Sequence, residues 1–254
     1  MEQNLKAIVR YDGTDFAGWQ IQPDQRTVQG TLEQALSQIA SRPIRVYGAA
    51  RTDAGVHALG QVISFRWPVE RYPVRRVHTS VSQMVSPDIR IESLEEAPPE
   101  FHARYSARGK HYAYVLSLGN RVPDPFSSRY AWSISWDLDF DCLARLAQRL
   151  QGTHDFAGFQ SSGSDMKTTE RTLYAVCLRR GGVVEPCDAA TLWRIDFHGD
   201  GFLYKMVRNI LGTLVAIARG NLPEERLMEL LYAPGPFHGH SAPSRGLTLM
   251  AVHY

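Results

Sequence analysis

The sequence predicts an α+β fold made of two ferredoxin-like units, each with the order strand, helix, strand, strand, helix, strand. Three observations support this prediction. Alternating apolar residues mark short strands, apolar residues with a helical period mark segments between them, and the same order of elements occurs in both halves. We expect the units to share one continuous mixed sheet with helices packed against it, and an active site in the cleft between them.

In the first half, the expected strands and helices alternate with short polar connections. In chain order, a strand, a helix, two strands, a helix and the start of a strand are expected at residues 5–11, 27–41, 44–50, 60–67, 74–85 and 88–92. The first helix places Val28, Leu32, Leu36 and Ile39 on one face. The Glu- and Pro-rich tract at 95–100 is the expected boundary, which gives subdomains 1–104 and 105–254.

The second half repeats the order. A strand, a helix, two strands, two helices and a strand are expected at 111–118, 138–151, 171–180, 191–198, 202–219, 223–232 and 247–254. Gly152 and Gly220 end the first and second of these helices, and the helix at 202–219 has Met206, Ile210, Leu211 and Leu214 on its core side. The loop around Pro123-Asp124-Pro125 is turn-rich, and the hairpin loop expected at 181–188 carries no expected chemistry.

Composition limits the class of protein. A chain of 254 residues with 44% hydrophobic residues can bury a large core, and neither a signal peptide nor a membrane span is expected, so we predict a cytoplasmic protein. The three cysteines, Cys142, Cys177 and Cys187, are odd in number and widely spaced. We therefore expect reduced thiols rather than a disulfide framework or a structural zinc site.

The charge pattern is compatible with nucleic acid. Net charge is only +2, yet the basic residues are almost all arginine, which suits bidentate phosphate contacts and stacking on bases. Codon bias in a GC-rich genome explains the same excess. Residues 101–114 carry three basic side chains and two histidines among three tyrosines, with no acidic residue. This run is typical of an RNA groove, and also of one solvated strand face.

The clearest candidate for chemistry is a polar loop between the strands expected at 44–50 and 60–67, which we name the Asp53 loop. It reads Arg51-Thr52-Asp53-Ala54-Gly55-Val56-His57-Ala58. An aspartate is ionised at neutral pH, and small residues allow the tight backbone that aims a nucleophile. On the residues alone, Asp-Ala-Gly between strands is more often a hairpin turn, so both interpretations stay open.

A second candidate lies on the helix expected at 202–219. Arg208 has many apolar neighbours there, so its guanidinium needs a carboxylate partner, for which Asp53 is a candidate, or must reach water. Gly212, one turn further, allows a backbone or a nucleotide to come close.

Six segments along the chain can be compared with known families. In chain order they are Tyr11-Asp12-Gly13-Thr14-Asp15-Phe16-Ala17-Gly18-Trp19-Gln20, residues 48–58, Phe101-His102-Ala103-Arg104, residues 152–156, residues 202–209, and Ala242-Pro243 with Gly246-Leu247. Together they extend over essentially the whole chain and resemble the tRNA pseudouridine synthase A family. The resemblance implies the pseudouridine synthase fold and an isomerase that converts uridine to pseudouridine at positions 38 to 40 of the tRNA anticodon stem-loop.

The resemblance also implies residue roles. Asp53 would be the nucleophile, Tyr112 would stack on the target base and assist proton movement, and Arg208 would pair with Asp53. The candidates for contact with RNA are Arg51, Thr52, His57, Trp19, Gln20, Gln22, Arg108, Lys110, Lys205 and Leu247. A purely structural role remains open for Tyr112 as a sheet-face aromatic and for Trp19 as a core residue.

The reaction is redox-neutral, so we expect no cofactor, and His238-Gly239-His240 is expected to be a flexible loop rather than a metal site. The family implies a homodimer that binds tRNA. Two other functions stay open. A catalytically silent RNA-binding module would show the same basic and aromatic face, and a retaining nucleoside hydrolase would use a carboxylate at the sugar but needs a second acid that this loop lacks. The sequence leaves open the preferred uridine and whether Asp53 acts at the sugar or at C6 of the base.

Overall fold

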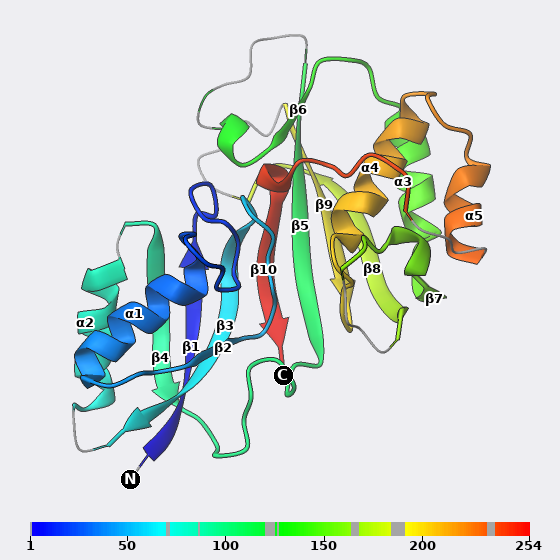
Figure 1. Cartoon of the computed structure of the whole chain (residues 1–254). Coiled ribbons are helices and arrows are strands. Elements are labelled where there is room, and N and C mark those ends of the chain that lie inside the picture. The colour runs from blue at the N-terminus through cyan, green and yellow to red at the C-terminus, as the bar shows by residue number, and fades with distance from the viewer. Residues whose placement is uncertain are drawn as a thin grey trace. The chain divides into compact units, whose positions relative to one another are not determined.

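The computed structural model describes residues 2–69, 72–85, 87–119, 125, 127–163, 168–183, 191–232 and 237–254. The chain divides into two compact units. The first contains Met1–Arg108 and Leu249–Tyr254, and the second contains Gly109–Thr248. Figure 1 labels the strands and helices of both units.

The first unit has the predicted order of elements. These are β1 (Glu2–Tyr11), α1 (Val28–Ala40), β2 (Val46–Gly48), β3 (His57–Pro68), α2 (Val74–Val85) and β4 (Ile89–Glu96), joined by the end of β10 (Leu247–His253). The strands follow the order β4-β1-β3-β10, β1 is antiparallel to both neighbours, and β2 pairs with β3. Figure 1 shows α1 and α2 beside each other on one face of this sheet.

Local sequence explains these elements. Thr27 caps α1 by accepting a hydrogen bond from the Gly30 N–H at 3.2 Å, and the chain leaves the helix through Ser41 in the left-handed conformation. The apolar face predicted for α1 meets the sheet and α2 in the core, where Ala7, Leu32, Leu36, Ile63, Phe65 and Val81 lie together. Burial of such side chains supplies most of the stabilisation of the unit.

The second unit combines a sheet with three helices. Its described elements are β5 (Gly109–Leu118), β6 (Trp132–Ile134), α3 (Phe140–Gln148), β7 (Gly152–Asp155), β8 (Glu170–Arg180), β9 (Leu192–Gly199), α4 (Met206–Ala218) and α5 (Glu225–Tyr232), with the start of β10. The strands follow the antiparallel order β5-β9-β8-β7, and β6 pairs in parallel with β5. The α+β prediction is confirmed.

Several predicted boundaries are wrong. The helix predicted from 202 begins at Met206, because Lys205 has a left-handed backbone (φ 58°) that a helix cannot include. The helix predicted at 138–151 spans only 140–148, since Asp139 caps it and a strand begins at Gly152. β6 and β7 were not predicted, because strands of three and four residues are too short for a periodic signal.

Some expectations concern parts of the chain outside the described residues, namely Pro123, Asp124, Cys187 and most of the loop at 181–188. Cys142 is a buried free thiol and Cys177 an exposed one. Within the described parts of the chain, no helix has the length and apolar character needed to cross a membrane.

Candidate active site

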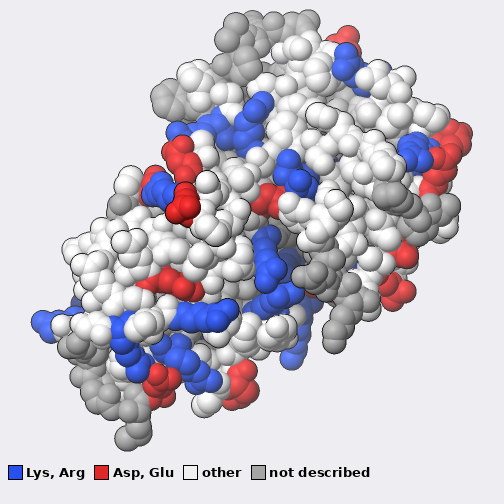
Figure 2. All heavy atoms as spheres, in the orientation of Figure 1, with Lys and Arg blue, Asp and Glu red and all other residues white. Residues whose placement is uncertain are grey.

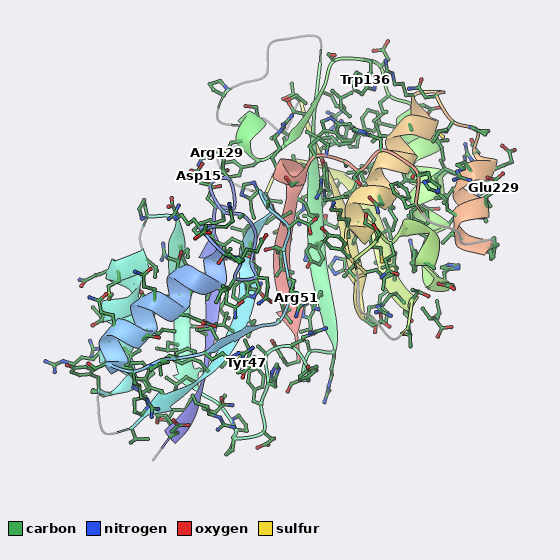
Figure 3. The ribbon with its side chains drawn as sticks, in the orientation of Figure 1. Asp15, Tyr47, Arg51, Arg129, Trp136 and Glu229 are labelled. Atoms are coloured by element: carbon green, nitrogen blue, oxygen red, sulfur yellow. The ribbon has the colours of Figure 1, made fainter. Side chains whose placement is uncertain are left out.

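The Asp53 loop connects β2 to β3 in the first unit. The Val56 N–H donates to the Asp53 carbonyl at 3.1 Å, and Gly55 has a φ of 76°, which is the geometry of a turn that favours glycine at its third position. The turn interpretation is therefore correct for the backbone. Asp53 is half-buried at the first position of the turn, and Arg51, two residues earlier, is exposed. Figure 3 labels Arg51 on this stretch of chain.

The segment from Gly13 to Trp19 packs directly against the Asp53 loop. The Trp19 N–H donates to the Thr52 carbonyl at 3.0 Å. A Cβ added at Gly13 would lie 2.0 Å from the Val56 carbonyl oxygen, and one added at Gly18 would lie 2.8 Å from the Thr52 carbonyl oxygen. Backbone therefore meets backbone on both sides of Asp53, and only glycine permits such an approach.

A buried polar network holds the other side of the loop. Gln61, which is fully buried, donates to the Ala50 carbonyl at 2.8 Å and accepts from the Ala50 N–H at 3.2 Å. Its amide also donates to the Tyr11 hydroxyl at 3.4 Å, which lies 2.8 Å from the Thr52 hydroxyl. Burial raises the pKa of Tyr11 to about 12, and the hydrogen bonds of Thr52 and Gln61 oppose part of that rise. The neutral phenol can therefore donate to Thr52.

His57 and Trp19 are interior residues. His57 is 4% exposed, and its Nδ1 accepts the Gly13 N–H at 3.0 Å. Trp19 is 2% exposed, and its ring lies so close to Gly48 that a Cβ there would be 2.4 Å from it. Both side chains support the turn geometry, and neither presents a ring face to solvent.

Gln20 and Gln22 are exposed beside them. The Gln22 amide donates to the Ala17 carbonyl at 2.8 Å. The segment that follows Gly18 therefore offers polar amides rather than the tryptophan ring to a ligand.

Tyr112 and Tyr114 lie on β5 in the second unit. Tyr112 is 7% exposed, and its ring meets Phe202 edge to face at 5.0 Å. Tyr114 is fully buried, donates to the Pro243 carbonyl at 2.7 Å, and has its ring against Gly246, where a Cβ would lie 2.5 Å from it. Burial raises the pKa of Tyr114, against the lowering effect of Arg208 and Arg245.

Arg208 lies in the first turn of α4 and is half-buried. Its Nε donates to the Ala242 carbonyl at 2.8 Å, and its own carbonyl accepts the Ala242 N–H at 3.0 Å. Gly212 allows this arrangement, because a Cβ there would lie 1.8 Å from the His240 carbonyl oxygen. Another backbone, rather than a nucleotide, fills the space at Gly212. The pairing of Arg208 with Asp53 stays a prediction.

Asn209, which stands in one of the matched segments, was not singled out from the sequence, and the structure makes it the centre of a buried hydrogen-bond network. It is fully buried and donates to the Phe159 carbonyl at 2.8 Å and to the Ser161 hydroxyl at 3.1 Å. The Ser241 hydroxyl donates to its amide oxygen. An amide on the apolar face of a helix is the signal that could have identified it, because a buried amide needs partners.

The remaining candidates are distributed over both units. Arg108 is exposed, Lys110 is half-buried on β5, and Leu247 is 6% exposed at the start of β10. Lys205 places its ammonium over the ring of Tyr204, 5.1 Å from the centroid. Lys205 has a left-handed backbone, a conformation that a residue other than glycine adopts only when the surrounding structure imposes it.

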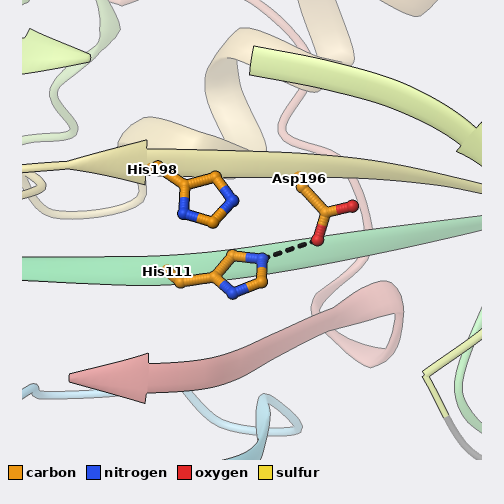
Figure 4. A group of neighbouring side chains, drawn as sticks. All are labelled: His111, Asp196 and His198. Carbon is orange, nitrogen blue, oxygen red and sulfur yellow. Dashed lines mark hydrogen bonds and ion pairs between the residues drawn. The ribbon is translucent and has the colours of Figure 1, made fainter. Parts of the chain in front are cut away.

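Among the described residues, one group has metal-ligand spacing: His111, Asp196 and His198, whose ligand atoms lie within 4.8 Å of one another (Figure 4). Asp196 accepts from His111 at 2.6 Å, Arg179 at 2.7 Å and Arg194 at 2.7 Å. Burial raises the pKa of Asp196, but these donors together hold it well below its usual range. Two guanidinium groups on the carboxylate oppose a divalent cation, so the geometry favours an internal ion network.

Comparisons with known proteins show similarity over most of the chain. A sequence model of a family described as tRNA pseudouridine synthase matches residues 7–106 and 146–254. The chain is 36% identical to tRNA pseudouridine synthase A of Geobacter sulfurreducens, over 99% of this chain and 100% of that protein. It is 41% identical to the protein of that name from Moorella thermoacetica, over 98% and 99%, and 38% identical to that of Latilactobacillus sakei, over 100% of both.

Proposed function

This chain belongs to the tRNA pseudouridine synthase family, whose members are isomerases, and from that membership we propose that it converts uridine to pseudouridine at positions 38 to 40 of the tRNA anticodon arm. The observation that carries the proposal is the Asp53 loop, where a half-buried carboxylate is held from two sides by backbone contacts and a buried polar network. Such rigidity is what a nucleophile aimed at one carbon atom requires.

The reaction breaks the bond between C1′ of the ribose and N1 of uracil, turns the base, and forms a bond between C1′ and C5. The proton on C5 is lost to solvent and N1 gains one, so the overall change is an isomerisation. In our proposal Asp53 is the nucleophile, and its attack at C1′, its removal of the 2′ proton or its addition to C6 would each serve. The free base has to be kept from water during the turn.

We assign two further roles in the second unit. Tyr112 offers a ring that can stack on uracil and a hydroxyl that can accept the C5 proton in a tuned site. Arg208 supplies positive charge from the first turn of α4, where Ala242 fixes its Nε. A guanidinium with a fixed orientation stabilises a developing negative charge better than a mobile one.

The RNA contacts that we propose are distributed rather than concentrated. Arg51 is exposed next to Asp53 and suits either the space left by a flipped base or a phosphate. Arg108, Lys110 and Lys205 are proposed phosphate contacts, so affinity should fall as salt rises. Figure 2 shows basic side chains interspersed with acidic ones over the face in view, in keeping with a net charge of only +2.

The test is release of tritium from tRNA transcribed with C5-tritiated uridine, measured for the wild type, Asp53→Ala and the isosteric Asp53→Asn. We expect release by the wild type alone, and tRNA affinity within about tenfold in both variants, because the carboxylate acts in the chemical step. Binding without release by the wild type would favour a silent RNA-binding module. Free uracil in the reaction would favour a nucleoside hydrolase.

A further inference from the structure

Three rings form a row on the surface of the first unit, which we name the aromatic row: Tyr47, His102 and Tyr105. The centroid of His102 lies 4.9 Å from that of Tyr47 and 4.4 Å from that of Tyr105. An arginine covers each end. The Arg45 guanidinium lies 5.6 Å from the Tyr47 centroid, and that of Arg104 lies 5.6 Å from the Tyr105 centroid.

The row is unusually open to solvent. Tyr105 is 77% exposed, the highest value among the large hydrophobic side chains of the described residues, and Tyr47 is 41% exposed. Adjacent exposed aromatic rings lose the stabilisation that burial would give them, and such patches generally mark a binding surface. None of the catalytic roles proposed above uses these rings.

Backbone hydrogen bonds hold the row in place. The His102 Nδ1 accepts the N–H groups of Arg104 at 3.1 Å and Tyr105 at 3.3 Å, and the Ser106 hydroxyl accepts the His102 N–H at 3.1 Å. Burial, reinforced by the charge of Arg104, lowers the pKa of His102. The central ring is therefore neutral at neutral pH. It lies tilted against both tyrosine rings, at 46° to Tyr47 and 36° to Tyr105, without repelling the arginines.

The two segments of the row are joined through β3. Tyr47 pairs with Ser64 across the β2–β3 ladder, and the Ser64 hydroxyl accepts the Ala103 N–H at 3.0 Å. This link explains why rings that are more than fifty residues apart in sequence stand side by side. The platform is thus built into the sheet that also carries the Asp53 loop.

We propose that the aromatic row is a stacking platform for an unpaired base of the tRNA substrate, with Arg45 and Arg104 placed to neutralise the phosphates on either side. The inference rests on the proposed function. Aromatic faces with arginines are the combination that binds single-stranded nucleic acid. The five arginines in residues 41–52 and 101–108, with no acidic residue among them, favour an anionic partner, although Arg42 is paired with Glu2. The exposed aromatic faces favour RNA over an acidic protein or a membrane, because they match the faces of bases.

The distance along the chain indicates which base. Tyr47 precedes Asp53 by six residues, and Figure 3 labels Tyr47 and Arg51 on this stretch of the chain. Six residues span at most about 20 Å, and stacked nucleotides advance about 3.4 Å each. A base stacked on Tyr47 and joined to the target uridine by a continuously stacked strand therefore lies within about six nucleotides of it.

The test measures the affinity of the full-length protein for an unmodified tRNA transcript. We expect Tyr105→Ala and Tyr47→Ala to raise Kd about 5- to 20-fold, at the lower end of what loss of one stacked base costs. Tyr105→Phe keeps the ring and should bind within about twofold of the wild type. Tyr232→Ala is the matched control, because Tyr232 is 69% exposed on α5 outside the row.

Salt dependence separates stacking from charge. Tyr105→Ala should leave the slope of log Kd against log salt unchanged, whereas Arg45→Ala and Arg104→Ala should each reduce it by about 0.7, the value for one phosphate on a single strand. Replacing loop nucleotides one at a time by abasic linkers should reveal a position where the loss is not additive with that of Tyr105→Ala.

Two results would overturn the platform. One is wild-type affinity in both tyrosine variants with unchanged thermal stability. The other is an equal loss in Tyr105→Phe and Tyr105→Ala, which would assign the effect to the hydroxyl. Failure of the proposed function is distinguishable from failure of the platform. A wild type that binds tRNA without releasing tritium would refute the isomerase and leave the affinity test intact, and the control Tyr232→Ala should release tritium at the wild-type rate.

Discussion

Gly18 lies against the carbonyl that precedes the proposed nucleophile, so its replacement tests how Asp53 is positioned. Gly18 has a φ of 98°, and a Cβ there would lie 2.8 Å from the Thr52 carbonyl oxygen and 3.1 Å from both the Ala54 nitrogen and the Asp53 carbonyl carbon. Carbon and oxygen atoms approach to about 3.3 Å without repulsion. In Gly18→Ala the backbone of the Asp53 loop must therefore withdraw by about 0.5 Å.

Gly18→Ala is expected to lower both the stability of the protein and the rate of the reaction. The left-handed backbone costs a non-glycine residue about 1–2 kcal/mol of stability. Since a displacement of 1 Å in a catalytic group can cost about 100-fold in rate, half that displacement predicts a loss of about tenfold. Affinity for tRNA should change by less than about threefold, because the shift is local to the carboxylate.

Gly181→Ala is the control. Gly181 has a φ of 108°, close to that of Gly18, but nothing lies within 4 Å of an added Cβ. Gly181→Ala should lose about 1–2 kcal/mol in urea unfolding from its backbone conformation, and Gly18→Ala should lose more because its Cβ also meets backbone atoms. Only Gly18→Ala should slow single-turnover tritium release at saturating tRNA. Equal rates in the two variants would refute the idea that this close approach positions Asp53.

Three further predictions concern buried polar groups. Gln61→Leu leaves the N–H and carbonyl of Ala50 without their partner and should cost about 2–5 kcal/mol in urea unfolding; a loss below 1 kcal/mol would contradict the network. Burial raises the pKa of Tyr11 to about 12, so the folded state keeps a proton that the unfolded state loses near pH 10. The free energy of unfolding should therefore fall by about 3 kcal/mol between pH 10 and 12. Tyr11→Phe should show a smaller fall over the same pH range. Asp196→Asn leaves Arg194, whose side chain is 12% exposed, without its counter-charge, and should cost about 3 kcal/mol at pH 7, whereas unchanged stability would refute the ion network.

Periodicity alone was enough for most of the fold. The α2 helix begins and ends at the predicted residues, although its pattern was the weaker of the two in its half, because Val77, Val81 and Val85 fall on one buried face. The start of α4 could not be predicted from the same rule. Residues 202–205 continue the apolar pattern, and only the left-handed Lys205 shows that the chain enters the helix from another direction.

The candidate site also has a part that could be predicted from the sequence and a part that could not. The role of Asp53 came from a resemblance, because a turn and a nucleophile loop share the same residues. What holds the loop could not be read from the sequence, since Gly13, Gly18 and Gln61 act on backbone atoms that are far away along the chain. Arg208 illustrates the same limit. The sequence could not show whether its guanidinium reaches water or a protein partner, because its Nε donates to a carbonyl of the distant segment at 240–243.

Part of the first matched segment, residues 11–20, is explained by its support of the Asp53 loop. Tyr11, Gly13, Gly18 and Trp19 all direct their contacts to the Asp53 loop or to the strands that flank it. We expect these residues to act by holding the backbone of the Asp53 loop in place. Changes in this segment should therefore lower the rate more than the affinity, whereas changes in the aromatic row should lower the affinity more than the rate. If the two sets of variants failed to separate in this way, the supporting and binding roles would have to be assigned to the same residues.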